Sequence, residues 1–176
     1  VLAAATRHGF VDIENYLAGA GDVATPPPGE GPSAADDAVV LYTSGSTSRP
    51  KGVRLKHFGM VENGFNIGER QGLRPGDRVF LPTPLFWSYG AANALPATFS
   101  HGGCLVLPDR FEAGAALSMI ERTACTAIYT LPAITNAMLR HASFNRTRTR
   151  TLRTGLTIGS PRDSLAAASE LGIPQL

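Results

Sequence analysis

The sequence is poor in the residues that mark disulfide-rich, metal-binding and membrane-spanning proteins. It has two cysteines, Cys104 and Cys125, and each sits singly in an apolar run without a partner at metal-ligand spacing. We therefore expect both to be reduced core residues of a cytoplasmic protein. No apolar run reaches the roughly 18 residues that a membrane-spanning helix needs. The first residues also lack the basic start and long apolar stretch of a secretion signal.

An excess of one charge is also missing. Lys and Arg total 16 against 14 acidic residues, and the net charge of +2 is too small to indicate a nucleic acid or a membrane surface as partner. Apolar residues make up 43% of the chain and charged residues 17%, a balance typical of a folded domain with a core. One basic stretch, residues 140–153, is interpreted as a solvated loop, with an anion-contact surface as the alternative.

Strand and helix patterns alternate after a connector. Residues 18–35 are rich in Gly, Pro, Ala and Ser, a composition that holds neither a helix nor a central strand. We therefore expect residues 1–35 to be an N-terminal segment with a connector and residues 36–176 to be part of one domain. The patterns predict strands at 38–43, 53–55, 78–82, 103–107, 126–131 and 155–158, and helices at 57–71, 88–99, 113–123, 133–141 and 162–171.

This alternation predicts an α/β fold, in which a mostly parallel sheet is flanked by helices. The run at 38–43 is apolar throughout and is bounded by acidic residues and by a Ser-Gly pair. We expect it to be a buried strand, because a strand covered on both faces has continuous rather than alternating apolar residues.

The turn after this strand has the composition of a phosphate-binding loop. Residues 42–52 read YTSGSTSRPKG and combine hydroxyls, glycines and one lysine. Glycines let the backbone approach phosphate oxygens, hydroxyls donate hydrogen bonds or hold magnesium, and lysine supplies a positive charge. A polyphosphate is the ligand that uses all three together.

Two other interpretations of this turn are weaker. The nucleotide loop of kinases and GTPases, G-x-x-x-x-G-K-[ST], counted from Gly45, would have glycine where Pro50 stands and Ser or Thr where Gly52 stands. Proline would also interrupt the cradle of backbone amides. A flexible Ser/Gly-rich linker need not follow an apolar strand or end in Pro-Lys-Gly before another one.

Residues 43–52, TSGSTSRPKG, are similar to the signature loop [ST]-S-G-[ST]-T-G-x-P-K-G of the acyl-adenylate-forming superfamily, which includes acyl-CoA synthetases, firefly luciferase and adenylation domains. Ser48 stands where that family usually has glycine. Residues 84–90, PLFWSYG, resemble the family segment P-L-F-H-x-x-G, with Trp87 in place of the histidine. Residues 159–161, Gly-Ser-Pro, resemble its G-[GA]-[ASE]-P element.

The resemblance implies an acyl-CoA synthetase that uses ATP, magnesium and coenzyme A on a small-molecule carboxylic acid, with a fatty acid as the default. A carboxylate would attack ATP to give an acyl-adenylate, and a thiol would then take the acyl group. The residues implied to bind the β- and γ-phosphates are Thr43, Ser44, Gly45, Ser46, Thr47 and Lys51. Thr47 is also the implied magnesium ligand. The implied acyl and nucleotide pocket contains Phe86, Trp87, Gly159, Ser160 and Pro161.

The resemblance also implies that the ribose-binding aspartate, the hinge arginine and the catalytic-lysine domain of the family would lie beyond Leu176. The expectation is then a partial N-terminal domain that is inactive alone and that self-associates through uncovered surface. Two alternatives stay open. One is an adenylation domain that delivers to a carrier-protein thiol, and the other is a truncated, non-catalytic homologue acting as a nucleotide-binding or interaction module.

Overall fold

The computed structural model describes residues 31–43 and 49–176. The chain divides into two compact units, Val1–Ser33 and Ala34–Leu176, and the helices and strands described below belong to the second. Most of the expected N-terminal segment and connector lies outside the described residues. Five positions of the predicted phosphate loop, 44–48, lie outside them as well.

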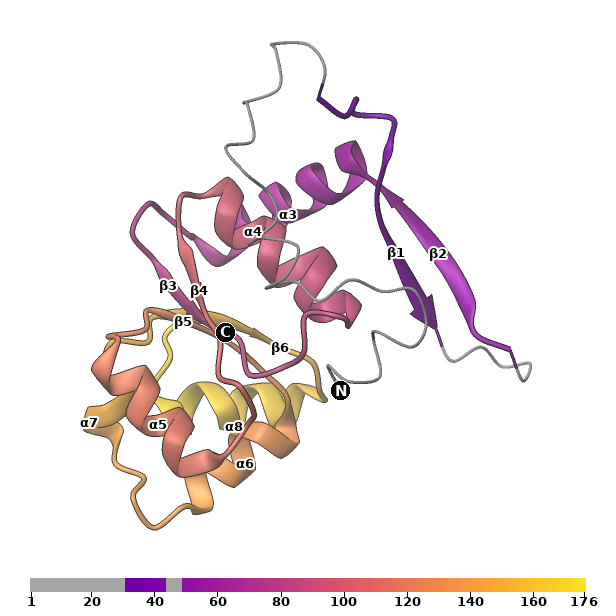
Figure 1. The fold of residues 1–176 in the computed structure, drawn as a ribbon. Helices are drawn as coiled ribbons and strands as arrows, with labels where there is room; N and C mark the ends of the chain where they lie inside the picture. Colours follow the sequence, from indigo (N-terminus) through magenta and orange to yellow (C-terminus); the bar gives the residue numbers. More distant parts are fainter. Residues whose placement is uncertain (1–30, 44–48) are drawn as a thin grey trace, which may run out of the picture. The chain divides into compact units, whose positions relative to one another are not determined.

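A parallel sheet of four strands forms the centre of the second unit (Figure 1). Its strands are β3 (Arg78–Phe80), β4 (Cys104–Val106), β5 (Ala127–Thr130) and β6 (Thr154–Thr157). They lie in the order β4-β3-β5-β6, and each neighbouring pair is parallel. The predicted α/β class and parallel sheet are therefore confirmed.

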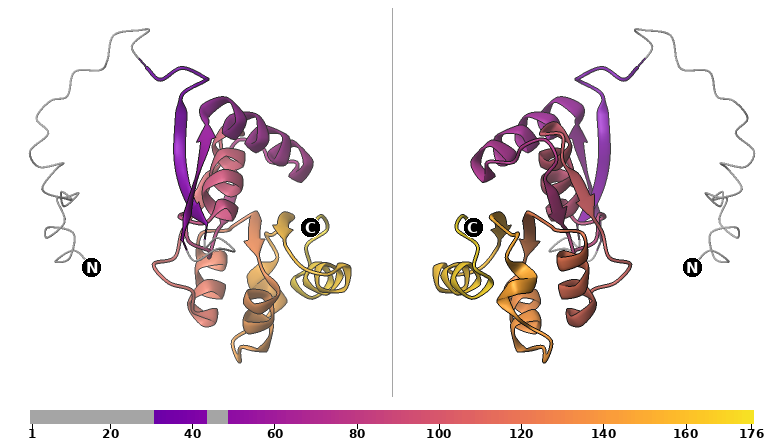
Figure 2. Two further views of the ribbon diagram at one scale, coloured as in Figure 1. Left: turned by 90° about the vertical axis from the view of Figure 1, so that its right-hand side faces the viewer. Right: turned by 90° about the vertical axis from the view of Figure 1, so that its left-hand side faces the viewer.

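Helices cover both faces of this sheet (Figures 1 and 2). One face carries α3 (His57–Gln71), the π-helix η2 (Tyr89–Ala94) and α4 (Leu95–Ser100). The other carries α5 (Ala113–Arg122), α6 (Pro132–Arg140) and α8 (Pro161–Leu171), with the short α7 (Arg146–Thr149) packed against α5 and α8.

The strand residues alternate between two hydrophobic clusters, as side chains on a pleated strand must. Phe80 and Ile128 are fully buried in the cluster that α5, α6 and α8 complete. Val79 and Tyr129, their neighbours in sequence, are fully buried in the other cluster, with residues of η2 and α4. Both faces of the central strands are thus covered, which explains their near-continuous apolar sequences.

The strand expected at 38–43 is present as β1 (Asp37–Thr43), but it is not buried. β1 pairs antiparallel with β2 (Lys51–Lys56) in a separate two-stranded sheet. Val40 is 45% exposed and Tyr42 is 74% exposed. A two-stranded hairpin has no further strands beside it that could cover its side chains. The apolar run in β1 is therefore not buried on both faces by the described residues.

Three smaller expectations also need correction. The helix expected at 88–99 is π-helical from Tyr89 to Ala94 and α-helical only afterwards. Cys125 is buried, but Cys104 is exposed because β4 is an edge strand. Within the supposed loop at 140–153, residues 146–149 form α7, and two arginines there bind carboxylates of the same chain. Arg148 pairs with Glu121 at 3.2 Å and Arg153 pairs with Asp77.

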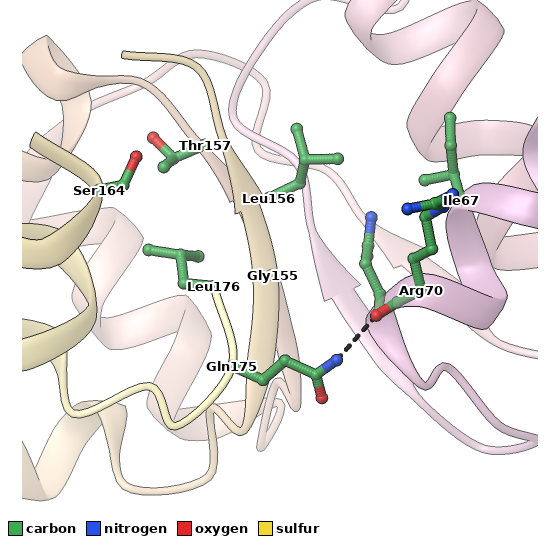
Figure 3. A pocket seen from close by; sticks show the side chains of 9 residues that line it. Ile67, Arg70, Gly155, Leu156, Thr157, Ser164, Gln175 and Leu176 are labelled. Carbon is green, nitrogen blue, oxygen red and sulfur yellow. Dashed lines mark hydrogen bonds between the residues drawn. The ribbon is translucent and has the colours of Figure 1, made fainter. Parts of the chain in front are cut away.

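The outer edge of β6 borders a hollow with a volume of about 430 Å³. Figure 3 shows it between α3, β6 and the last residues of the chain. Gln175 forms a single parallel bridge with Thr154, and its Nε2 donates to the carbonyl oxygen of Arg70 at 2.7 Å. None of the site residues expected from the sequence lines this hollow.

Among the described residues, helices are too short or too polar to pass through a lipid bilayer.

Candidate functional site

The β1–β2 hairpin fixes both ends of the predicted phosphate loop. Thr43, the last residue of β1, pairs directly with Lys51, the first residue of β2. Side chains directly opposite each other on antiparallel strands have Cβ atoms about 5 Å apart. The hydroxyl of Thr43 and the ammonium of Lys51 therefore belong to the two ends of one short turn. The residues between them include Ser44, Gly45, Ser46 and Thr47, which lie outside the described residues.

Lys51 differs from Arg54 and Lys56, the other basic residues of β2, in its charge environment. Arg54 pairs with Asp37 at 2.5 Å, and Lys56 lies 4.0 Å from the same carboxylate. No carboxylate among the described residues forms an ion pair with Lys51, which is exposed. Among the described residues, the charge of Lys51 thus has no competing carboxylate and can meet an anionic ligand, whereas Arg54 and Lys56 share the carboxylate of Asp37.

The structure brings the start of this loop together with the aromatic segment. Thr43, Tyr42 and Leu41 line a hollow of about 270 Å³ together with residues of the segment that follows β3. Those residues are Phe86, Trp87, Ser88 and Tyr89. Two sequence-predicted elements, 43 residues apart at Thr43 and Phe86, thus share one hollow. Trp87 is half exposed and packs edge-on to Phe86, with ring centroids 6.2 Å apart.

The aromatic segment lies where an α/β sheet is expected to bind ligands. The chain passes from β3 to β4 and then returns past β3 to β5, so the strand order reverses between β3 and β5. Ligands of open α/β sheets bind outside the carboxyl ends of the strands at such a reversal. Residues 84–89 follow the carboxyl end of β3, and the hydroxyl of Tyr89 reaches the carbonyl oxygen of Thr130 at the end of β5, 3.0 Å away.

Gly159, Ser160 and Pro161 form the connection from β6 to α8 and do not line the 270 Å³ hollow. Ser160 begins α8 through a capping box. Its Oγ lies 3.3 Å from the amide of Asp163, and its own amide donates to the carboxylate of Asp163 at 3.0 Å. Hydrogen bonds from the Ser160 side chain and backbone lower the pKa of Asp163. A Cβ on Gly159 would lie 2.9 Å from Cγ of Pro132, so glycine permits this close approach.

Two interactions of this region were not predicted from the sequence: the capping contact of Asp163 with Ser160 and the hydrogen bonds of the Tyr89 hydroxyl. Ser160 followed by Asp163 matches the spacing of a capping box, so that signal was available, although the usual acidic partner is glutamate. Tyr89 lies in the predicted aromatic segment 84–90, but the partners of its hydroxyl were not predicted. Its hydroxyl also donates to the carbonyl oxygen of Leu156 at 2.7 Å, and no local pattern reveals a contact between residues so far apart in sequence.

The described residues provide no cluster of three or more His, Cys, Asp or Glu side chains that could hold a metal ion. Thr47, the expected magnesium ligand, lies outside them. Magnesium in nucleotide sites is commonly held by one or two protein groups together with the phosphates themselves. The role of Thr47 therefore stays a prediction.

The family comparison agrees with the resemblance of the three motifs. A model of the AMP-binding enzyme family matches residues 4–169. The chain belongs to the AMP-binding enzyme family, and its fold is that of part of the N-terminal domain of acyl-CoA synthetase-like proteins.

Particular relatives point the same way. YngI of Bacillus subtilis, which carries an acyl-CoA synthetase name, is 37% identical over 120 residues, which is 68% of this chain and 22% of YngI. The N-terminal domain of FACL13 from Mycobacterium tuberculosis has a TM-score of 0.75 at 25% identity, and the match covers 92% of this chain and 40% of that domain. O-succinylbenzoate coenzyme A synthetase (MenE) of B. subtilis, solved in complex with AMP, has a TM-score of 0.65 at 28% identity, covering 81% of this chain and 36% of MenE.

Proposed function

We propose that the whole protein activates a carboxylic acid with ATP and transfers the acyl group to coenzyme A. The observation that carries this proposal is the shared hollow, in which the base of the TSGSTSRPKG loop faces the Phe86–Trp87 segment. Membership of the AMP-binding enzyme family supports the use of ATP. The chain spans 22% of YngI and 36% of MenE, so the activity is proposed for the whole protein.

In the first step, a carboxylate oxygen attacks the α-phosphorus of ATP, the bond to the bridging oxygen breaks, and pyrophosphate leaves. Negative charge grows on the leaving group, and donors already in position stabilise it without reorganisation. We assign the β- and γ-phosphates to Thr43, Ser44, Gly45, Ser46, Thr47 and Lys51. Lys51 is the described residue of this set that can neutralise charge, because it has no carboxylate partner among the described residues.

In the second step, the thiol of coenzyme A attacks the acyl carbon and AMP leaves. We assign Phe86 and Trp87 to the wall of the acyl passage, since both are exposed to the hollow beside Thr43. Trp87 has no imidazole, so it can shape the passage but can neither accept nor donate the thiol proton as histidine does. Gly159, Ser160 and Pro161 are assigned to the nucleotide side of the pocket, at the carboxyl end of β6.

The experiment that tests this proposal is acid-dependent exchange of labelled pyrophosphate into ATP, followed by mass detection of acyl-CoA. A panel of fatty, aromatic and small dicarboxylic acids should yield at least one acid that supports exchange, and coenzyme A should convert that acid to its thioester with release of AMP. Cleavage of ATP to ADP at a rate that does not depend on the added acid would contradict the proposal. Acylation of a carrier-protein thiol with no acyl-CoA would reassign the acceptor.

A further inference from the structure

Tyr89 connects three parts of the molecule that meet at the site. Its side chain is 7% exposed and lines the hollow beside Thr43. Its hydroxyl lies 3.0 Å from the carbonyl oxygen of Thr130 and 2.7 Å from that of Leu156. These carbonyls belong to β5 and β6 near their carboxyl ends, so one phenol joins the aromatic segment to both strands.

Backbone hydrogen bonds hold together the aromatic segment that contains Tyr89. The carbonyl oxygen of Trp87 accepts hydrogen bonds from the amides of Gly90 at 3.0 Å and Ala91 at 2.8 Å, and the amide of Trp87 donates to Pro84 at 3.2 Å. A Cβ on Gly90 would lie 2.8 Å from the carbonyl oxygen of Pro84, so the two ends of the turn touch. These contacts connect residues 84–90 closely, so we expect a displacement of Tyr89 to displace the ring of Trp87 as well.

The backbone here is a π-helix that begins at Tyr89. Single π-helical turns inside helices are rare, and they are frequent at functional sites because they aim a side chain that a regular α-helix would turn away. The irregular turn sets the direction of the Tyr89 side chain, and the two strand carbonyls hold its end.

We infer that Tyr89 is a positioning residue for the acyl passage, holding the Phe86–Trp87 wall at a fixed distance from the carboxyl ends of β5 and β6. This inference rests on the proposed function, because it takes that wall to contact the acyl group. The loop beyond Thr43 is anchored separately, by the pairing of β1 with β2. Loss of the Tyr89 hydroxyl should therefore weaken binding of the acyl part while leaving binding of the phosphates intact.

A buried tyrosine of the same cluster provides a matched control. Tyr129 is fully buried, its ring centroid lies 5.2 Å from that of Tyr89, and its hydroxyl accepts from Nε2 of Gln71 at 2.8 Å. That hydrogen bond leads to α3 and not to the aromatic segment. Burial raises the pKa of the Tyr89 phenol and raises that of Tyr129 to about 12. Both hydroxyls stay protonated near neutral pH.

The experiment compares Tyr89→Phe and Tyr129→Phe with the unchanged protein. Trp87 is the single tryptophan of the chain, so its fluorescence reports on the wall directly. Acrylamide quenching of Trp87 is measured without ligand. Affinities are then measured for Mg·ATP and for octanoyl- and benzoyl-sulfamoyl adenosine, which are stable mimics of an acyl-adenylate. Thermal unfolding of all three proteins measures how much stability is lost with each hydroxyl.

Tyr89→Phe should alter the quenching of Trp87 and weaken binding of at least one acyl-sulfamoyl adenosine by roughly threefold to tenfold, the range for one lost hydrogen bond. Its affinity for Mg·ATP should stay within about twofold. Tyr129→Phe should lower the unfolding temperature but leave the quenching and all three affinities unchanged. Equal behaviour of the two variants would overturn the inference. The proposed function concerns the whole protein and is decided by the pyrophosphate exchange assay. If the chain by itself binds no nucleotide, the quenching of Trp87 decides the role of Tyr89.

Discussion

Thr43 and Lys51 face each other as the last residue pair of the β1–β2 hairpin. This pairing fixes the separation of the two residues that flank the predicted phosphate loop. The same pairing places the hydroxyl of Thr43 opposite Lys51, whose ammonium has no carboxylate partner among the described residues.

Two glycines of α3 should respond oppositely to alanine. A Cβ on Gly64 would lie 2.5 Å from Cβ of Pro96 and 2.6 Å from its carbonyl carbon, so α3 and α4 would have to move apart. We expect Gly64→Ala to destabilise the protein by about 1–3 kcal/mol, the usual cost of overpacking. Gly59, in the same helix, has no neighbouring atom within 4 Å of such a Cβ.

Gly59→Ala is therefore the control, and it should stabilise the protein by about 0.5–1 kcal/mol through helix propensity alone. Urea unfolding of both variants measures the two changes. A Gly64→Ala protein as stable as the Gly59→Ala protein would show that α3 and α4 do not pack as described.

Glu112 should contribute stability that depends on pH. It caps α5, and its carboxylate accepts from the amide of Gly114 at 2.8 Å and that of Ala115 at 2.7 Å. Both hydrogen bonds lower the pKa of Glu112, and the one from Gly114 has the larger effect. A carboxylate whose pKa is lower in the folded state stabilises the protein above its unfolded pKa of about 4.3, and this stabilisation is lost as the pH falls through the folded value.

The comparison with Glu112→Gln isolates this effect, since glutamine does not titrate. The unchanged protein should be more stable than Glu112→Gln near pH 7, and the difference in free energy of unfolding should shrink as the pH falls below about 4. A difference that is the same near pH 7 and near pH 3 would exclude the carboxylate as the cap.

An apolar stripe on α3 should make the chain self-associate. Phe58, Val61 and Phe65 follow the i, i+3, i+7 spacing of one helix face and are 62%, 59% and 49% exposed. Sedimentation should therefore show an average mass that rises with concentration. Val61→Lys should weaken association by about tenfold or more, since a valine contributes roughly 1.5 kcal/mol on burial. Glu62→Lys, beside the stripe, serves as control. A concentration-independent monomer would contradict this prediction.

Most of the sheet and helix pattern was predictable because the central strands are short and lie between periodic helices. Strands expected at 78–82 and 126–131 contain β3 and β5, and the helix expected at 57–71 matches α3 at both ends. The error at β1 has a physical reason. A continuous apolar run in a sequence indicates contact with other apolar surface, but it does not say which strand becomes the partner or whether described residues provide the cover.

In the candidate site as well, local patterns could be predicted from the sequence and long-range contacts could not. The loop composition and the aromatic segment were visible as local patterns, and the structure brings Thr43 and Phe86 to one hollow. The phosphate-binding roles stay predictions, since residues 44–48 lie outside the described residues. Tyr89 could not be singled out, because its hydroxyl bonds to Thr130 and Leu156, which are 41 and 67 residues away. Such contacts follow from the topology of the sheet.

The central claim is that the hairpin loop binds the phosphates of ATP, and a titration of Mg·ATP followed by Trp87 fluorescence tests it most directly. Lys51→Ala removes an ammonium that pairs with no carboxylate in the described part of the chain, while Lys56→Ala, in the same strand, removes one that lies 4.0 Å from Asp37. We expect Lys51→Ala to weaken binding of both ATP and pyrophosphate by about tenfold or more, the loss of a charge-assisted hydrogen bond. Lys56→Ala should bind as the unchanged protein does. Equal affinity of the Lys51→Ala and Lys56→Ala proteins for Mg·ATP would contradict the claim.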